Sequence, residues 1–519
     1  MAAGHRASAH AGARTLAEGG NAVDAAIAAA FAGAVCEGPL TGPGAGGFLM
    51  VAAPGRAPVV LDFFVAVPGL GPDGRRLNPA DLDAFTVPFG DAEQVFHIGA
   101  ASIAVPGMLQ GLFAAWERYG RMGLSELVAP GVELARQGVV IGPRSAFLYR
   151  ILGAMLCFTP DAATVYAPAG TVLGEGEIFR NAALAETLEE LARTGVEAIG
   201  PGGWLSRRIV EGVAAAGGLV TAADMAEYQV IERRPLQTRF RGRMVYLNPP
   251  PSSGGVLIAA ALSHLDGRPV AEDVVTRYRN LVRAGEFANS LRTEAFATRL
   301  HEVADQELIE WSEITGVGDG IPVTRGPNGT THVSVVDRDG MIASLSSSNG
   351  TASGVMVPGT GFLLNNMMGE EDLNPGGFGT MSPGMRMTSM MAPTIVMDGG
   401  RPYLGLGSAG SNRLRSAILQ TLVGIMDDDL PVGRAVARPR VHPERGGIDI
   451  EGGVPEAVSA ALEAEGCHLR RWSGLSLFFG GVSAVGWHDE DLQGAGDPRR
   501  GGAAFAVAES GEVIELSTA

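Results

Sequence analysis

The sequence contains no lysine, so arginine supplies all 39 of its basic residues. This absence excludes any mechanism that needs a lysine nucleophile or Schiff base. Cysteine is also scarce: Cys36, Cys157 and Cys467 lie far apart and form no CxxC pair. Their spacing argues against a disulfide framework or a zinc site and favours buried free thiols.

Long apolar runs are missing as well. The Ala25–Val35 segment is far shorter than the roughly 20 residues that span a bilayer. The first 26 residues contain no apolar core like that of a signal peptide. We therefore expect a soluble, cytoplasmic protein that makes no membrane contact. A start assigned too far downstream would instead fit a secreted or periplasmic protein.

Positive charge is in deficit, because the net charge is −17 and the pI is near 5.0. Nucleic-acid binding needs a basic face, so this balance argues against it. The sequence has no GxSxG elbow, no Walker loop and no HExxH motif. Its nine histidines are scattered, and His301 and His442 have no partner at metal-ligand spacing. We expect neither a metal nor an organic cofactor.

Glycine, in contrast, is abundant, with 75 residues in a chain of 519. Such a content predicts many tight turns and close backbone approaches. Hydrophobic residues make up 46% of the chain, which is enough for a sizeable core. The length is large for one domain, yet extensive mixed sheets can use it around a single core.

The order of the predicted elements suggests sheets covered by helices in one compact unit. Helices are expected first and short strands mainly after residue 330, without internal repeats. A polar stretch, residues 316–329, is predicted to be an exposed linker. The expected helices are 8–18, 22–35, most of 105–240, 256–313, 412–426 and 455–465, and the expected strands include 48–53, 59–65 and 239–246.

Two stretches match the dinucleotide fingerprint GxGxxG. Residues 42–47 follow a helix and precede a strand, which is the wrong order. Residues 405–410 follow a strand and open a helix, but no clear βαβ unit surrounds them. A glycine turn at a helix N-terminus directs backbone N–H groups at one point, so it suits an oxyanion as well as a phosphate.

The stretch PNGTTHVSVV, residues 327–336, has two interpretations. Asn-Gly followed by Thr, Val and Ser is typical of a turn that feeds a strand. Alternatively the chain is cut there, so that a threonine becomes a new N-terminus whose own amine serves as the base.

Motifs along nearly the whole chain resemble those of the gamma-glutamyltransferase (glutathione hydrolase) family. They occur in the family's order, which makes chance an unsatisfactory explanation. The segments that carry the resemblance are EGGNAVDAAIAAAF, GPGAGGFLM, ASIAVPGMLQGL, YGRMGLSELVAPGVELARQG, GGLVTAADMAEYQ, NPPPSSGG, GTTHVSVVDRDG, GTGFLLNNM, MTSMMAPTIV, GLGSAGSNR and GAGDPR.

The resemblance implies an α/β (α+β) fold of the N-terminal nucleophile hydrolase type, a four-layer αββα sandwich. It implies one unit over residues 1–519 that cuts itself between Gly329 and Thr330. The fragments 1–329 and 330–519 would then form a heterodimer, and a higher homo-oligomer stays open. This resemblance favours cleavage over a plain turn. Strand structure is the simpler interpretation of Thr331 and His332, and we prefer it for His332.

The catalytic roles also come from the resemblance. Thr330 would be the nucleophile, with its freed α-amine as the base; an α-amine has a pKa near 8. The backbone N–H groups of Gly410 and Ser411 would form the oxyanion hole. The family supports its nucleophile with a hydroxyl two residues before an asparagine. Anchoring on Asn349 gives Ser347, which we favour, whereas counting forward from Thr330 gives Ser348.

The resemblance further assigns the binding of a γ-glutamyl group. Thr388 and Ser389 would hold its α-carboxylate, and Glu370 would hold its α-amine. Asn366 would be a further substrate-binding residue, and Asn365 precedes it in register. Where the family has a carboxylate-binding arginine, this chain has Phe64, which cannot replace a guanidinium. Arg386 is a candidate substitute, and residues 367–386 are candidates for a lid.

The resulting prediction is a gamma-glutamyltransferase-like enzyme that cleaves γ-glutamyl amides such as glutathione and passes the acyl group to water or an acceptor amine. Two alternatives stay open. The missing arginine allows a different acyl amide as the substrate. The changes at Phe64 and Ser411 also allow an unprocessed binding protein that has kept the fold.

Overall fold

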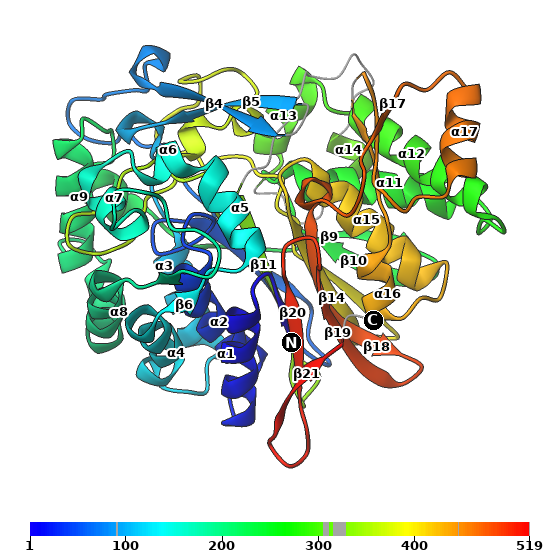
Figure 1. Ribbon diagram of the computed structural model, residues 1–519, viewed down its shortest axis with the longest axis horizontal. Helices are drawn as coiled ribbons and strands as arrows, with labels where there is room; N and C mark the ends of the chain where they lie inside the picture. The colour runs from blue at the N-terminus through cyan, green and yellow to red at the C-terminus, as the bar shows by residue number, and fades with distance from the viewer. Residues whose placement is uncertain (90–91, 305–310, 315–328, 445, 518–519) are drawn as a thin grey trace.

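The computed structural model describes residues 1–89, 92–304, 311–314, 329–444 and 446–517. Two sheets lie at the centre of the molecule, and helices cover the outer face of each sheet (Figure 1). The architecture is therefore a mixed α+β sandwich of four layers, αββα, as the sequence predicted. Within the described residues, no helix has the length and apolar character required to cross a membrane.

The larger sheet combines strands from both sides of the predicted cleavage point. Its order is β21-β20-β1-β11-β12-β2-β3-β8. In chain order these strands are β1 (Ala2–Ala3), β2 (Gly46–Ala52), β3 (Val59–Phe63), β8 (Ile231–Arg233), β11 (Gly329–Val336), β12 (Ile342–Gly350), β20 (Ala503–Val507) and β21 (Val513–Leu516). Strands β11 and β12 lie at the centre of this order, and every one of their residues is buried.

The smaller sheet has the order β19-β18-β14-β13-β10-β9 and packs against β11 and β12 through β14 and β18. Its strands are β9 (Leu236–Phe240), β10 (Arg243–Leu247), β13 (Thr394–Asp398), β14 (Arg401–Ala409), β18 (Gly481–His488) and β19 (Asp491–Gly496). The single strand predicted over 239–246 is wrong. Arg241 and Gly242 both have positive φ, 50° and 83°, which is the backbone of a tight hairpin turn between β9 and β10.

One helical layer covers the larger sheet. Its main helices are α1 (Arg6–Ala17), α2 (Ala22–Cys36), α3 (Met108–Tyr119), α4 (Leu124–Gln137), α8 (Ala182–Thr194) and α9 (Trp204–Ala215). Shorter helices at its edge are α5 (Pro143–Ile151), α6 (Gly153–Leu156), α7 (Pro160–Tyr166) and α10 (Ala222–Glu227). The predicted helices in the first 240 residues are confirmed.

The other helical layer covers the smaller sheet, mainly through α11, α15 and α16. Its helices are α11 (Ser253–Asp266), α12 (Val274–Ser290), α13 (Glu294–Glu302), α14 (Trp311–Ile314), α15 (Arg413–Met426), α16 (Val432–Ala437) and α17 (Glu456–Ala464). Three short strands, β15 (Val441–Glu444), β16 (Gly447–Ile450) and β17 (Leu469–Arg471), lie beside them.

One hairpin, one further pair of short strands and several single turns complete the described chain. The pairs β4 (Asp83–Phe89) with β5 (Ala92–Ile98) and β6 (Val139–Val140) with β7 (Ile178–Phe179) were not predicted. Most of the linker predicted over 316–329 lies outside the described residues. Its last residue, Gly329, is buried and begins β11 rather than ending an exposed loop.

Helix α2 shows how the sequence builds a buried layer. Asn21 accepts hydrogen bonds from the backbone of Val23 and Asp24, and Asp24 in turn accepts from the Asn21 N–H, which completes a capping box. All 15 residues of the helix are buried. Small alanine side chains permit this close packing against β11 and β12 on one side and α1 and α4 on the other.

The space between the two sheets contains a cluster of polar side chains as well as apolar ones. This polar cluster consists of His332, Ser334, Ser344 and Ser346. His332 on β11 lies 2.8 Å from Ser346 Oγ and 2.9 Å from Ser334 Oγ through its two ring nitrogens. Ser344 Oγ donates to Leu406 O on the opposite sheet at 3.1 Å. Burial lowers the pKa of His332 to about 3, so the ring is neutral. Gly407 faces it, and a Cβ there would lie 2.3 Å from the imidazole.

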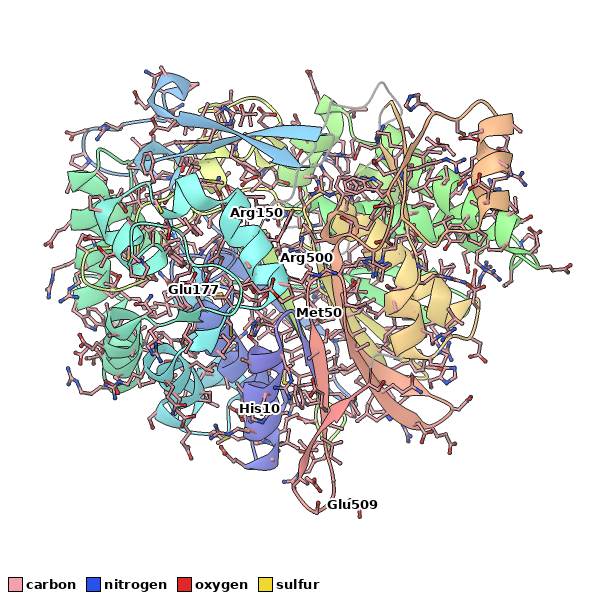
Figure 2. All side chains as sticks on the ribbon, in the orientation of Figure 1. His10, Met50, Arg150, Glu177, Arg500 and Glu509 are labelled. Atoms are coloured by element: carbon pink, nitrogen blue, oxygen red, sulfur yellow. The ribbon has the colours of Figure 1, made fainter. Side chains whose placement is uncertain are left out.

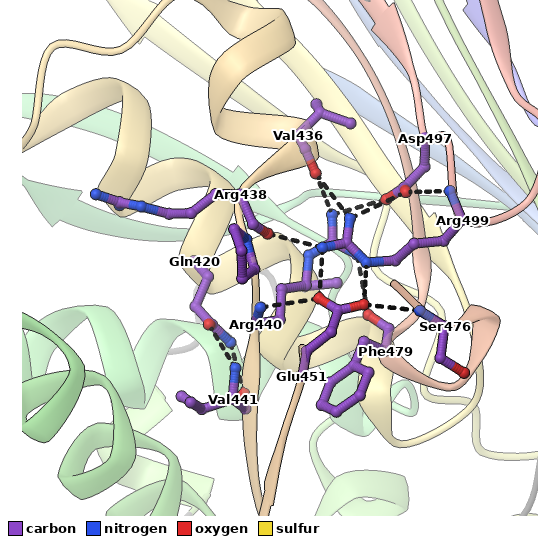
Figure 3. A network of polar contacts seen from close by, with 12 residues as sticks. Gln420, Val436, Arg438, Arg440, Val441, Glu451, Ser476, Phe479, Asp497 and Arg499 are labelled. Carbon is purple, nitrogen blue, oxygen red and sulfur yellow. Dashed lines mark hydrogen bonds and ion pairs between the residues drawn. The ribbon is translucent and has the colours of Figure 1, made fainter. Parts of the chain in front are cut away.

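A buried ion network fixes the turn between β19 and β20 (Figure 3). Arg440 and Arg499 both contact Asp497, at 2.7 and 3.1 Å, and Arg499 also forms two bonds to Glu451, at 2.7 and 2.6 Å. Burial alone would raise the pKa of Asp497, but the two guanidinium groups outweigh it and the net shift is downward. Asp497 also accepts from the Val482 N–H at 2.9 Å, which ties the turn to β18.

We expect Asp497→Asn to destabilise the fold by about 3–5 kcal/mol, because it leaves two buried guanidinium groups with half of their compensation. The depressed pKa means that this stabilisation is present at neutral pH and lost as pH falls through the folded-state value. Chemical denaturation at several pH values measures the cost. Glu463→Gln is the control, since its exposed pair with Arg471 should contribute little. Equal costs for the two variants would contradict the proposed importance of the network.

Candidate active site

Thr330 lies at the start of β11, in a bulge. The pairing of β11 with β12 shifts register between Gly329 and Thr331. Bulges redirect side chains and are frequent beside active sites. Here Thr330 is 4% exposed and lines a pocket of about 370 Å³, counting the space open to solvent. The pocket walls are Phe64, Ser348, Gly350, Met367, Glu370, Asp372, Leu373, Ser389, Met390, Met391, Ser411 and Leu414.

Ser348 is the hydroxyl that the structure brings to Thr330. The Thr330 hydroxyl donates to Ser348 Oγ at 3.4 Å, and the Gly350 N–H donates to the same oxygen at 2.9 Å. Ser348 Oγ itself donates to the carbonyl oxygen of Gly329. One serine therefore contacts both the nucleophile candidate and the carbonyl that self-cleavage would attack.

The favoured choice of Ser347 is corrected by this geometry. Ser347 Oγ lies 2.7 Å from Thr41 Oγ1, and the Asn349 side chain donates to Gly38 O at 3.2 Å. Neither residue lines the Thr330 pocket. The reason is the two-residue period of a strand: Ser346 and Ser348 face the smaller sheet, while Ser347 and Asn349 face the helical layer. Anchoring on the asparagine moved the prediction by one residue, and so to the wrong face of β12.

Gly410 and Ser411 form the turn between β14 and α15. Their φ angles are +121° and +53°, so the backbone is left-handed at both positions. Ser411 carries the strain of that conformation, which a glycine would avoid. Asp372 stabilises it by accepting from Ser411 Oγ at 3.1 Å and from Asn412 Nδ2 at 2.8 Å. The turn borders the pocket through Ser411, and its role as an oxyanion hole stays a prediction.

Asp372 was missed by the sequence analysis. The acidic run Glu370–Asp372 was its only signal, and only Glu370 in it had a role implied by the resemblance. In the structure Asp372 lines the pocket and links a single-turn helix, Glu371–Leu373, to the glycine turn. The Asp372 carboxylate also helps to raise the pKa of Glu370.

Glu370 lines the pocket, and its role as a binding group for an amine stays a prediction. Burial and then the neighbouring Asp372 raise its pKa to about 8, although the Asn366 side chain and the Thr351 N–H act in the opposite direction. Asn366 accepts from the Thr351 N–H at 2.8 Å and so holds the loop beside Gly350. Asn365 is further away and bonds to the carbonyls of Gly44 and Ala104. A bound ammonium group would favour the charged form of Glu370.

Of the two predicted hydroxyls, only Ser389 lines the pocket. The Thr388 hydroxyl donates to Pro251 O at 2.7 Å and does not reach the site, which corrects that prediction. Met390 and Met391 follow Ser389 on the pocket wall. The wall therefore offers one hydroxyl and two thioethers, and is more apolar than the resemblance implied.

Arg386 does not substitute for the missing arginine. It donates to the carbonyls of Phe64 and Gln229, and its Nε lies 3.4 Å from Asp62. Its guanidinium also lies 4.6 Å from the centre of the Tyr228 ring. Phe64 occupies the pocket wall itself and stacks on Phe48 at 5.5 Å. Among the described residues, no guanidinium lines the Thr330 pocket.

The described part of the chain contains no group of three or more His, Cys, Asp and Glu side chains placed to hold a metal ion. Cys36, Cys157 and Cys467 are free thiols. The chemistry that the site offers is a threonine hydroxyl beside a serine, a glycine turn at a helix start, and a pair of acidic residues across a largely apolar pocket.

We expect Ser348→Ala to slow self-cleavage by about 10²–10³-fold, because it removes the donor to the Gly329 carbonyl. The fraction of intact chain, followed over time by denaturing electrophoresis, measures the effect. Ser347→Ala is the matched control, since that hydroxyl contacts Thr41 on the opposite face. If Ser347→Ala slows self-cleavage more than Ser348→Ala does, the assignment of Ser348 is refuted.

Glu370→Gln tests the raised pKa of this acid. The folded-state pKa of Glu370 lies above the usual value of 4.5. Its contribution to stability is therefore fully present below pH 4.5 and is lost as pH rises through about 8. The free energy of unfolding of the variant, relative to that of the native protein, should therefore rise by about 2–4 kcal/mol from pH 5 to pH 9. Denaturant titrations at both pH values measure the difference. Glu371→Gln, at an exposed neighbour, should show none. A pH-independent difference for Glu370→Gln would contradict a buried neutral acid.

Comparison with known sequences identifies the family of this chain. The Gamma-glutamyltranspeptidase family model matches residues 8–507. The chain is 31% identical over 525 residues to the Acylase ACY 1 proenzyme of Pseudomonas sp. (strain V22), with 97% of this chain and 92% of that protein covered. It is 28% identical to the glutathione hydrolase proenzyme of Escherichia coli (strain K12), with 93% and 87% covered.

Structural comparison confirms the fold. The crystal structure of cephalosporin acylase from Bacillus halodurans matches with a TM-score of 0.82 at 24% identity, over 96% of this chain and 94% of that one. The predicted N-terminal nucleophile hydrolase architecture is thus confirmed. Since the family model spans nearly the whole sequence, the chain belongs to the gamma-glutamyltranspeptidase family of N-terminal nucleophile hydrolases.

Proposed function

We propose that the protein is a self-processing threonine amidohydrolase whose nucleophile is Thr330. The supporting observation is the contact of Ser348 with both the Thr330 hydroxyl and the Gly329 carbonyl. Attack of Thr330 Oγ on the Gly329 carbonyl carbon forms an ester, and the peptide nitrogen leaves as the α-amine of Thr330. Water then hydrolyses the ester, which gives a Gly329 carboxylate and restores the hydroxyl.

Turnover of a substrate repeats this chemistry. The neutral α-amine of Thr330 takes the hydroxyl proton as Oγ attacks the amide carbonyl, and the N–H groups of Gly410 and Ser411 stabilise the oxyanion. The amine half leaves with a proton, and an acyl-Thr330 ester remains. Water or an acceptor amine then releases the acyl group. The active form consists of the two fragments held in one sandwich.

The acyl group that fits this pocket best is largely apolar and lacks a carboxylate beside the reacting chain. Phe64 takes the wall position at which the family has an arginine, and Met390 and Met391 extend the apolar surface. A carboxylate buried there would have no cationic partner among the described residues, which is costly. The similarity to proteins named acylases accords with this preference.

A γ-glutamyl group is the second candidate, and Glu370 and Ser389 favour it. Glu370 is placed to pair with an ammonium, and Ser389 can donate to a carboxylate. The family also includes proteins named glutathione hydrolases, at 28–30% identity. The two candidates differ in the charged groups of the acyl chain, so a matched set of substrates separates them.

Self-processing predicts two species in the intact mass of denatured protein. Their masses should sum to that of the chain plus one water, and the smaller should begin with Thr330. We expect Thr330→Ala to stay whole and inactive, because it has no nucleophilic oxygen. A single full-length native species would favour the alternative of an unprocessed binding protein. A Thr330→Ala variant that still splits would sink the assignment of the nucleophile.

The acyl preference is tested with four chromogenic 4-nitroanilides. Their acyl groups are γ-glutamyl, glutaryl without the amine, 4-aminobutyryl without the carboxylate, and butyryl without either. We expect loss of the carboxylate to leave kcat/KM unchanged or to raise it, since no guanidinium lines the described pocket to bind a carboxylate. Phe64→Arg should selectively raise γ-glutamyl and glutaryl turnover, by about tenfold for one charged hydrogen bond. A strong native preference for γ-glutamyl would establish the second candidate instead.

A further inference from the structure

Methionine side chains gather in one part of the core, the apolar cluster between the two sheets. Among the described residues, six of the 23 buried members of this cluster are methionines, compared with five of 66 in the cluster beneath α1–α4 and one of 45 in the cluster beneath α11 and α15. The six are Met50, Met367, Met368, Met387, Met391 and Met397. Met50, on β2, lies near the centre of the molecule, between the helical layers (Figure 2). The 18 methionines in 519 residues do not account for such a concentration.

This methionine-rich cluster reaches the pocket of Thr330. Met367 and Met391 belong both to the cluster and to the pocket wall, as does Phe64. Met390, also on the wall, belongs to the apolar cluster beneath α11 and α15. The three methionine side chains are 2–6% exposed. Each of them thus lies between the pocket and an apolar core, so a thioether that rotates toward the core deepens the pocket and exchanges one apolar environment for another.

The backbone that carries Met390 and Met391 is firmly held. Asn248 Nδ2 and Ser252 Oγ donate to the Met391 carbonyl at 3.0 and 2.9 Å. The Met390 carbonyl packs on Gly254, where an added Cβ would lie 1.9 Å from its oxygen. Methionine side chains, in contrast, are unbranched and have three rotatable bonds, so they fill spaces of irregular shape. The wall therefore combines a fixed backbone with adaptable side chains.

One weak hydrogen bond holds the Met390 side chain in the observed conformation. Ser253 Oγ lies 3.2 Å from the Met390 sulfur and 3.1 Å from the Ser389 carbonyl oxygen, and it is placed to donate to either acceptor. A thioether sulfur is a weak acceptor. When the sulfur moves away, the Ser389 carbonyl still satisfies the hydroxyl, so release of Met390 leaves no buried donor unpaired.

We propose that Met367, Met390 and Met391 determine the acyl specificity, and that they repack around linear apolar acyl chains of different lengths. The inference rests on the proposed function and adds the class of substrate: a range of aliphatic amides rather than one acyl group. A wall of β-branched residues would instead favour one size, because such side chains are stiff at χ1. Glu370 lines the same pocket and is largely neutral at pH 7, because its pKa is raised to about 8, so an apolar chain beside it does not bury a full charge.

The test is a series of linear 4-nitroanilides whose acyl groups are acetyl, butyryl, hexanoyl and octanoyl. If the wall adapts, each added methylene is buried, and kcat/KM should rise by about fourfold per methylene from acetyl to hexanoyl, the fold-change that corresponds to burial of one CH₂. A maximum at acetyl or butyryl, with lower kcat/KM for hexanoyl, would overturn the inference. This measurement uses the native protein, so it decides the question even if a variant does not fold.

Met390→Ile and Met391→Ile stiffen the wall with little change in volume. In each variant the ratio of hexanoyl to acetyl kcat/KM should fall by about tenfold, because the extra methylenes then overpack the pocket. Met397→Ile is the matched control: it makes the same substitution in the methionine-rich cluster, on β13 and outside the pocket lining, and should leave the ratio unchanged.

An unchanged ratio in both pocket variants would contradict the inference, and so would an equal fall in Met397→Ile. Failure of the proposed function has a different signature, since it appears as an uncut chain that hydrolyses none of the anilides.

Discussion

The site depends on the two-sided burial of β11 and β12. Both strands are central in the larger sheet, with helix α2 on one face and the smaller sheet on the other. A side chain on these strands therefore enters one of two different environments, and its residue number decides which. Thr330, His332 and Ser348 share the face between the sheets, whereas Thr331 and Ser347 face the helical layer.

The environment between the sheets explains the many serines of β12. A purely apolar interface would give the sheets no preferred register, and unpaired polar groups there would be costly. His332 satisfies both ring nitrogens with serine hydroxyls, and Ser344 and Ser334 reach carbonyl groups of the opposite sheet. This polar cluster fixes β11 at His332, which is two residues from Thr330. The nucleophile candidate is thus held by the rigid centre of the fold rather than by a loop.

The buried arginines of this protein mainly serve the fold. Arg440, Arg499, Asp497 and Glu451 neutralise one another and support the turn beside β18. Arg386 is similarly engaged, with Asp62 and backbone carbonyls. Arg500 follows Arg499 directly in the chain, and the charges of Asp497 and Glu37 act on it, although its buried Nε and Nη2 atoms have no hydrogen-bond partner among the described residues.

The sequence alone determined most of the main helices, the position of Thr330 at a strand start and the glycine turn at the start of α15. These are local features, set by capping residues, glycine and hydrophobic periodicity. Tertiary structure decided which side chains meet. The packing of β12 between the helical layer and the smaller sheet set the face of each of its residues through the two-residue strand period, and so chose Ser348 over Ser347. Asp372 and Met390 came to the site through contacts between distant segments, whose geometry no local pattern records.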